Sequence, residues 1–259
     1  WPRAPRDPHT PRAGRHERAL PAATAAALRA HAERNGLPLK SLLLAIHLQV
    51  LSLASGARDV VTGLVSNGRP AETDGAAMVG LFLNTLPFRL DVDAHDWTSL
   101  ARTAGAAEAD LFAHRRYPMA AIAGLLAPGN GAARFDTSFN FVDFHAYDAL
   151  RRDGALTVVE ARSHEAVEIP CATTFAVTRA NDGARGITVS LSYDRDAFSD
   201  AQIAWLADRY VQAADHFAAR PDDAGARFAA ADAAALRASQ GAPADLPAGD
   251  LLARVRAVA

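Results

Sequence analysis

The chain has 259 residues, of which 50% are hydrophobic and 22% charged, with 27 Lys and Arg against 29 Asp and Glu. This is the composition of an ordinary globular protein, and it excludes disordered, collagen-like and disulfide-stapled chains. A formal net charge of −2 leaves no excess of cations for a phosphate backbone, so we do not expect a nucleic-acid partner. The single cysteine, Cys171, cannot form an internal disulfide, and the longest apolar run, 41–54, is shorter than the ~20 residues that cross a bilayer. We therefore expect a cytoplasmic protein that is not bound to a membrane.

The beginning of the chain is predicted to be irregular, and two helices follow. Residues 1–20 are rich in Pro and Arg and have no apolar periodicity, which predicts a lead-in with a solvated basic arm. An Ala-rich helix is expected from residue 21 to Asn35-Gly36, and a second helix from Pro38 to Gly56. Apolar residues almost surround the second helix, so we expect it deep in the core, with His47 as a hydrogen-bonded core histidine.

Strands and helices alternate through the rest of the chain. Strands are predicted over 59–65 and, largely buried, over 79–90, followed by helices over 97–114 and 118–126. Four short strand-like segments come next, with Asn181-Asp182-Gly183 as a hairpin signal between the last two. They cover residues 135–144, 155–162, 171–179 and 186–194. A closing helix is expected over 200–219, and the whole order predicts a mixed α/β fold with an open mixed sheet flanked by helices.

No local motif identifies a reaction. The sequence has no Cys-x-x-Cys or His-x-x-x-His pair, no Gly-rich phosphate loop followed by Lys-Ser/Thr and no Gly-x-Ser-x-Gly, so we expect no metal site. His31 and His216 are expected on helix surfaces without a role. Cys171 is expected to be a small buried hydrophobe.

Five segments, taken in order, carry a resemblance to a known family. MVGLFLNTLPFRL at 78–90 closely resembles the Gly-x-Phe-x-Asn-Thr-x-x-x-Arg core motif of condensation domains from nonribosomal peptide synthetases. Four further segments resemble the neighbouring motifs of these domains: DVVTGLVSNGRP at 59–70, HRRYP at 114–118, FDTSFNF at 135–141 and LSYDRDAFS at 191–199. The chain lacks the His-His-x-x-x-Asp-Gly motif of the first lobe, so it is similar to the C-terminal lobe only.

The resemblance implies a chloramphenicol-acetyltransferase-like lobe and a division of the chain. Residues 1–18 would be an irregular lead-in from a missing N-terminal lobe, and 19–220 the C-terminal lobe itself. Residues 221–248 would form a linker, and 249–259 the start of the next domain, an adenylation domain.

The activity that the resemblance implies is amide-bond formation between a donor acyl thioester and the amine of an acceptor aminoacyl group. Both reactants would be carried on the phosphopantetheine arms of peptidyl carrier proteins, and no metal or other cofactor would be bound directly. The catalytic histidine lies outside this chain, so the lobe would supply the second wall of a tunnel and the isolated chain would be inactive. Its partners would be the N-terminal lobe, the donor and acceptor carriers and the adenylation domain. A starter or epimerisation variant and an inert carrier-docking module remain alternatives.

The resemblance also implies roles for five residues. Asn140 matches the tunnel asparagine of the family and would bond the reacting carbonyl, or else the backbone of a neighbouring strand. Ser138 and Asn84 are assigned to the same tunnel. Arg69, with Arg89 as its rival, would pair with the aspartate of the histidine motif across the lobe junction.

Arg115 and Arg116 depart from the family, which has Gln-Asp at these positions of the HRRYP segment. Two arginines at a helix start are unfavourable to the helix dipole. They would therefore meet an acidic carrier-protein helix, or else belong to a solvated face.

Overall fold

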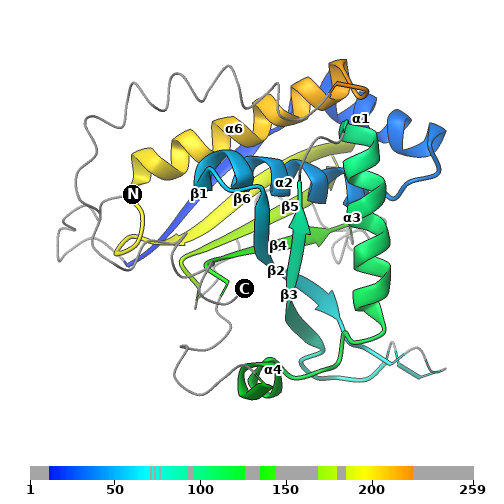
Figure 1. Cartoon of the computed structure of the whole chain (residues 1–259), viewed down its shortest axis with the longest axis vertical. Coiled ribbons are helices and arrows are strands. Elements are labelled where there is room, and N and C mark those ends of the chain that lie inside the picture. The colour runs from blue at the N-terminus through cyan, green and yellow to red at the C-terminus, as the bar shows by residue number, and fades with distance from the viewer. Residues whose placement is uncertain are drawn as a thin grey trace, which may run out of the picture.

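The computed structural model describes residues 12–70, 72, 74–75, 77–92, 96–125, 135–143, 169–179 and 185–223. Within these ranges a six-stranded sheet, in the order β1-β6-β5-β4-β2-β3, carries helices α1, α2 and α6 packed across one face, with α3 beside α2 (Figure 1). The strands are Ala13–Ala19 (β1), Asp59–Asn67 (β2), Leu83–Asp91 (β3), Thr137–Val142 (β4), Cys171–Arg179 (β5) and Arg185–Asp194 (β6). The helices are Ala22–Arg34 (α1), Leu39–Ser55 (α2), Trp97–Phe112 (α3), Met119–Leu125 (α4) and Asp200–Ala219 (α6).

The sheet is open and mixed, as the sequence predicts. β4 runs parallel to both of its neighbours, β2 and β5, whereas β1, β3 and β6 pair antiparallel. The carboxyl ends of β2, β4 and β5 therefore lie at the same edge of the sheet. Among the described residues no single helix has the length and hydropathy to cross a membrane, and α1 and α2 meet that test only as a pair bent by 118°.

Helix α2 forms the centre of the core, which confirms the prediction from its nearly continuous apolar surface. Residues 41–50 of this helix are all buried, between the sheet on one side and helices α3 and α6 on the other. The helix ends at Gly56, whose φ of 69° is the left-handed conformation that glycine adopts without strain. This central helix places His47 directly behind the middle of the sheet.

The prediction of an irregular lead-in is wrong for residues 13–19. They form β1, which pairs with β6 from Ala13 opposite Asp194 to Ala19 opposite Thr188. The arginines nearby make ion pairs, because Arg12 meets Asp194 at 2.6 Å and Arg18 meets Asp208 at 3.0 Å. A solvated arm is therefore not what these residues form, and residues 1–11 lie outside the described ranges.

The strand predicted over 79–90 is also placed differently. β3 is an edge strand, and only Leu86 and Phe88 along it are buried, so it is not largely buried as expected. Pro87 is compatible with this position, because an edge strand has one side on which a missing N–H leaves no partner unsatisfied. Val79 and Leu81, just before the strand, are fully exposed.

The closing helix agrees with the prediction at both ends. α6 spans Asp200–Ala219, and Ser199 and Gln202 form a reciprocal capping box at its start. Several other expectations lie outside the described residues: the strand over 155–162, the hairpin signal at 181–183, the linker beyond 223 and the final segment 249–259.

Candidate functional site

The two faces of β4 separate the core from the candidate site. Thr137 and Phe139 project toward the helices, and the Phe139 ring is fully buried with its centroid 5.4 Å from that of His47. Side chains alternate along a strand, so Ser138 and Asn140 project from the opposite face. The structure thus brings these two predicted residues together on the face that the helices leave uncovered.

Neither polar side chain on this face has a partner among the described residues. Ser138 is buried and Asn140 is half-buried, yet neither side chain makes a hydrogen bond within the described ranges. The alternative in which Asn140 bonds the backbone of a neighbouring strand is therefore absent from the described part of the sheet. An asparagine amide in this position offers two donors and an acceptor to whatever meets the face.

Gly63 and Phe135 complete the floor of the candidate site, and the sequence prediction did not include them. Gly63 lies opposite Ser138 in the parallel register, and a Cβ added to it would collide with the ring of Phe135. The position therefore requires glycine. A glycine inside a strand indicates a close approach of another group, so DVVTGLV already contained the signal.

Asn84 does not lie with Ser138 and Asn140, which corrects its assignment to the same tunnel. It pairs with Ser66, on the face of β2 that also carries Thr62 and Leu64. Its Nδ2 atom donates to the carbonyl oxygens of Arg115 at 3.1 Å and Tyr117 at 2.8 Å. Asn84 therefore fastens the turn between α3 and α4 to the edge of the sheet.

Arg69 and Arg89, the two candidates for the lobe junction, both bind groups within this chain. Nη1 of Arg69 donates to the carbonyls of Gly75 and Met78, at 2.8 and 2.6 Å, and its guanidinium lies 4.3 Å from the centroid of Phe82. Arg69 thus holds the turn before β3 in shape.

Arg89 forms a two-point ion pair with Asp59. The Arg89 Nη2 and Nε atoms lie 2.5 and 2.8 Å from the Asp59 carboxylate oxygens. These hydrogen bonds lower the pKa of Asp59 below its ordinary value.

Arg115 and Arg116 are not at a helix start, which corrects the premise of their docking prediction. They lie in the turn after α3, and α4 begins only at Met119. Arg115 lies 4.0 Å from the centroid of Phe112, and Nε of Arg116 donates to the carbonyl of Gly68 at 2.9 Å. Six exposed apolar side chains lie either just before and at the start of β3 or at the end of α3 and in the turn after it: Met78, Val79, Leu81, Leu83, Phe112 and Tyr117. We call these six residues the apolar surface.

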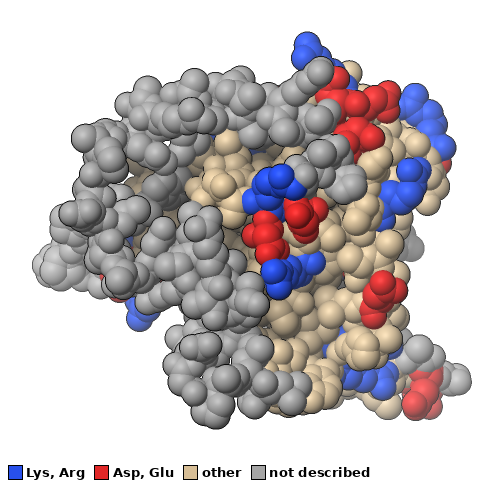
Figure 2. All heavy atoms as spheres, viewed as in Figure 1, with Lys and Arg blue, Asp and Glu red and all other residues tan. Residues whose placement is uncertain are grey.

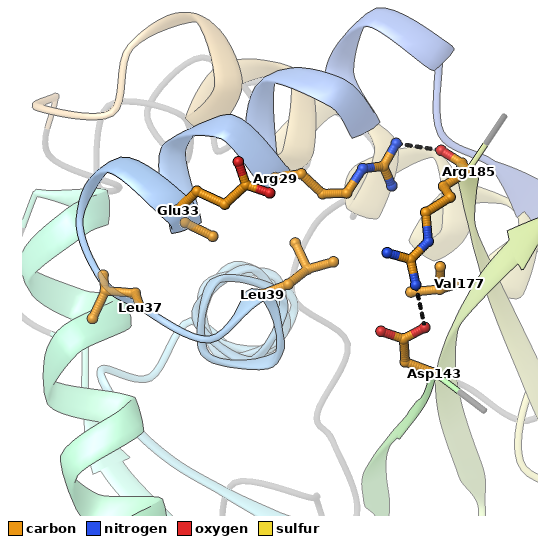
Figure 3. Close-up of a pocket in the computed structure, with 8 residues that line it drawn as sticks. Arg29, Glu33, Leu37, Leu39, Asp143, Val177 and Arg185 are labelled. Atoms are coloured by element: carbon orange, nitrogen blue, oxygen red, sulfur yellow. Dashed lines mark hydrogen bonds and ion pairs between the residues drawn. The ribbon is translucent and has the colours of Figure 1, made fainter.

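A separate pocket lies at the carboxyl ends of β4 and β5, between the sheet and α1 (Figure 3). Arg29 and Arg185 face Glu33 and Asp143 there, and Leu37, Leu39 and Val177 form its apolar wall. Arg185 pairs with Asp143 at 3.3 Å, and Arg29 donates to the carbonyl of Arg185. Burial, with the charge of Arg185 as a second cause, lowers the pKa of Arg29. The pocket therefore has two cations and two anions and no net charge. On the face of the molecule that Figure 2 shows, acidic and basic side chains likewise lie side by side.

Positions are predicted for three histidines, His47, His31 and His216, and the structure confirms the prediction for His47. His47 is completely buried and bonded on both ring nitrogens, which confirms the core prediction. His31 is also buried, with Nε2 3.0 Å from Oγ1 of Thr98, so the prediction of a surface position is wrong for this residue. His216 is half-buried, and its Nδ1 accepts the indole N–H of Trp97. The sequence gives no sign of this, because α3 covers these helix faces only in the folded chain.

The chain belongs to the condensation-domain family. The sequence profile of that family, described as "Condensation domain", matches residues 2–234. The sequence is 42% identical over 198 residues to the AMB antimetabolite synthetase AmbE of Pseudomonas aeruginosa, a match that covers 75% of this chain and 9% of that synthetase. It is 40% identical over 104 residues to malpinin synthetase of Mortierella alpina, which covers 40% of this chain and 1% of that synthetase. The chain thus spans a small part of these relatives.

Solved structures agree with this family and with the chloramphenicol-acetyltransferase-like fold. The X-domain from teicoplanin biosynthesis superposes with a TM-score of 0.68 and 25% identity, over 83% of this chain and 49% of that one. The first condensation domain of the calcium-dependent antibiotic synthetase superposes with a TM-score of 0.63 and 18% identity, over 82% of this chain and 46% of that one, and shows the fold alone. The chain therefore spans about half the length of these two solved domains.

Proposed function

We propose that the chain is the C-terminal lobe of a condensation domain, over residues 19–220, and that it forms one wall of the tunnel in which a peptide synthetase makes an amide bond. The observation that carries this proposal is the face of β4 opposite the helices, where the Asn140 amide and the Ser138 hydroxyl have no partner among the described residues. The coverage of about half of the solved domains supports the assignment to a single lobe.

In this reaction the amine of the acceptor attacks the thioester carbonyl of the donor. A C–N bond forms, the C–S bond breaks, and the proton lost by the amine passes, by way of a base on the other lobe, to the sulfur, which leaves as the carrier thiol. Asn140 would donate from Nδ2 to the carbonyl oxygen, which gains negative charge in the tetrahedral transition state. Ser138 and the wall formed by Gly63 and Phe135 would orient the thioester and exclude water.

The proposal includes four partners outside the chain. The N-terminal lobe would cover the face of Asn140, two peptidyl carrier proteins would deliver the reactants on phosphopantetheine arms, and an adenylation domain would follow the linker. Arg69 would reach the lobe junction in addition to holding its own turn, with Arg89 as the alternative. Arg115 and Arg116, beside the apolar surface, would contact the acidic helices of a carrier.

The experiment that tests this function is Asn140→Ala in the complete parent synthetase, with amide formation measured between two loaded carriers. Loss of one preorganised donor to a developing oxyanion should slow the chemical step about 10²–10³-fold, with little change in Tm. Asn35→Ala is the matched control, because it removes the same amide from the end of α1, away from β4 and from Arg115 and Arg116. Wild-type rates in Asn140→Ala would overturn the role of Asn140, and the 259-residue chain forming amide by itself would overturn the assignment to one lobe.

A second function is favoured by one of the solved relatives. An X-domain that is 25% identical to this chain, with a TM-score of 0.70, was solved in a complex with OxyB from teicoplanin biosynthesis. By that analogy the lobe would belong to a module that recruits another enzyme and makes no amide bond. A parent protein that binds a tailoring enzyme but leaves both carriers unreacted would support this function in place of the first.

A further inference from the structure

We propose that His47 is a positioning residue for the candidate site: from inside the core it fixes the part of β4 that carries Ser138 and Asn140. The inference rests on the proposed function for its effect on rate, but not for its effect on structure. His47 lies on α2 and touches neither Ser138 nor Asn140. Its influence passes through the alternate residues of the same strand.

His47 reaches β4 at two points, one on each side of Ser138. Its Nε2 atom lies 2.9 Å from Oγ1 of Thr62, and that hydroxyl in turn donates to the carbonyl oxygen of Thr137 at 3.2 Å. Its ring also contacts the ring of Phe139, with centroids 5.4 Å apart. The residues before and after Ser138 are thus both held from the core side, and Asn140 follows directly.

One arrangement of protons around His47 satisfies all three contacts of the Thr62 hydroxyl. The Thr62 hydroxyl donates its one hydrogen to the Thr137 carbonyl and accepts from the Thr137 hydroxyl at 3.1 Å. In this arrangement His47 donates to Thr62 from Nε2. Its Nδ1 is then unprotonated and accepts the hydroxyl hydrogen of Tyr210, which lies 2.8 Å away.

The series of hydrogen bonds through His47, which we call the relay, continues to β5. In the same arrangement Tyr210 donates its one hydrogen to His47, and the Thr173 hydroxyl, 3.3 Å away, is the donor of its contact with Tyr210. Thr173 lies opposite Phe139 in the register of β5 with β4. A single direction of donation thus runs from β5 through α6 and α2 to the first carbonyl of β4.

The whole relay is buried, which makes its loss specific. The side chains of His47, Thr62, Tyr210 and Thr173 are all at most 1% exposed. Water cannot replace a missing member without opening the core, and a buried group left without its partner is costly. Removing the Thr62 hydroxyl therefore takes a partner from the His47 ring nitrogen and from the Thr137 hydroxyl, and the start of β4 loses its side-chain bonds to Thr62.

Thr62→Val and Thr62→Ser are the decisive pair of variants. Valine keeps the branched shape of threonine but removes the hydroxyl, whereas serine keeps the hydroxyl. His31→Phe is the matched control, since His31 is likewise buried and bonded to a threonine, Thr98, but has no bond to β4. A misplacement of the order of 1 Å at a site costs up to about 10²-fold in rate. We expect Thr62→Val to slow single-turnover amide formation in the parent synthetase about tenfold or more, Thr62→Ser to restore it, and His31→Phe to leave it unchanged.

A second measurement separates this inference from the proposed function. In the isotope-labelled 259-residue chain, NMR should show His47 as the Nε2–H tautomer and should show the side-chain amide signals of Asn140 shifting in Thr62→Val but not in His31→Phe. If the Asn140 signals of the chain shift in Thr62→Val but the parent synthetase makes no amide bond, the positioning role would stand and the proposed function would be refuted. The inference would be overturned if the Asn140 signals did not shift in Thr62→Val. It would also be overturned if the rate of amide formation fell in every variant, including His31→Phe, in proportion to its loss of Tm.

Discussion

The indole N–H of Trp97 donates to Nδ1 of His216 over 2.8 Å, and this bond joins the start of α3 to the end of α6. Beside it, the backbone N–H groups of Trp97 and Thr98 donate to the carbonyls of Asp223 and Pro221, at 3.3 and 3.2 Å. The first N–H groups of a helix have no partner within the helix. The segment that follows α6 supplies partners for two of them, and His216 can accept the indole N–H only while its Nδ1 carries no proton.

This histidine chemistry predicts that the fold loses stability in mild acid. Burial lowers the pKa of His216 and His31, and it lowers that of His47 to about 3. Their ordinary pKa is about 6.5, so below pH 6.5 the unfolded chain binds more protons than the folded one. The stabilisation is complete above pH 6.5 and decreases as the pH falls toward the folded-state values.

His47 alone should account for about 2 kcal/mol of lost stability at pH 5. Urea unfolding followed between pH 7.5 and 5 measures the slope. His47→Gln removes this titrating group, so its free energy of unfolding should depend less steeply on pH. A wild-type stability that is constant over this range would contradict the assignment of the buried histidines as neutral.

Cys171 should be inert in the folded protein. Its side chain is buried, and burial raises the pKa of the thiol to about 12, so the reactive thiolate is nearly absent at pH 8. Labelling with Ellman's reagent should be complete in urea and negligible without it. Labelling that is fast in native buffer, and that does not speed up with denaturant, would show that the strand around Cys171 opens independently of the core.

Asn84→Asp should destabilise the chain more than Asn84→Ala does. Alanine removes two hydrogen bonds to the carbonyls of Arg115 and Tyr117, whereas aspartate also places a carboxylate oxygen against these acceptors. A buried or half-buried acceptor that loses its donor costs about 1–3 kcal/mol. Free energies of unfolding for the two variants measure the effect, with Thr85→Ala on the same strand as the control. Equal losses at all three would contradict a specific role for this amide.

Arg69 and Arg89 should respond differently to removal. Arg69→Ala eliminates both bonds that hold the turn before β3, so amide hydrogen exchange should accelerate across residues 77–82. Arg89→Ala breaks an exposed ion pair with Asp59, an interaction of small net effect on stability, and exchange in the same segment should not change. Slow exchange in Arg69→Ala would show that the turn is held by other contacts.

The elements that could be predicted from the sequence are those specified by neighbours along the chain. The apolar surface of α2 and the Ser199 cap of α6 are local signals, and both helices occur where these signals indicate. β1 could not be found this way, because AGRHERA has no alternation of apolar residues. It is a strand only because β6, far along the chain, provides a partner for each residue from Ala13 to Ala19.

The residues of the candidate site also divide into those that local sequence identifies and those that only the folded chain brings together. Ser138 and Asn140 could be named because they belong to a recognisable segment and alternate along one strand. The motif alone places Asn84 in the same tunnel, but it does not say which face of β3 the side chain occupies, and the pairing of Asn84 with Ser66 decides that. The relay from Tyr210 to Thr62 was invisible for another reason: its members come from α6, α2 and β2 and meet only in the packed core.

The pairing of β1 with β6 has a consequence for the way the lobe is made. A ribosome releases β1 early, and the strand must wait unpaired until Asp194 and its neighbours have followed. During that interval β1 is free to pair with the β6 of any similar lobe nearby, which is the situation that leads to domain swapping. The ion pairs of Arg12 with Asp194 and of Arg18 with Asp208 would then select the correct partner and register, because only a strand with the same spacing of charges forms both ion pairs.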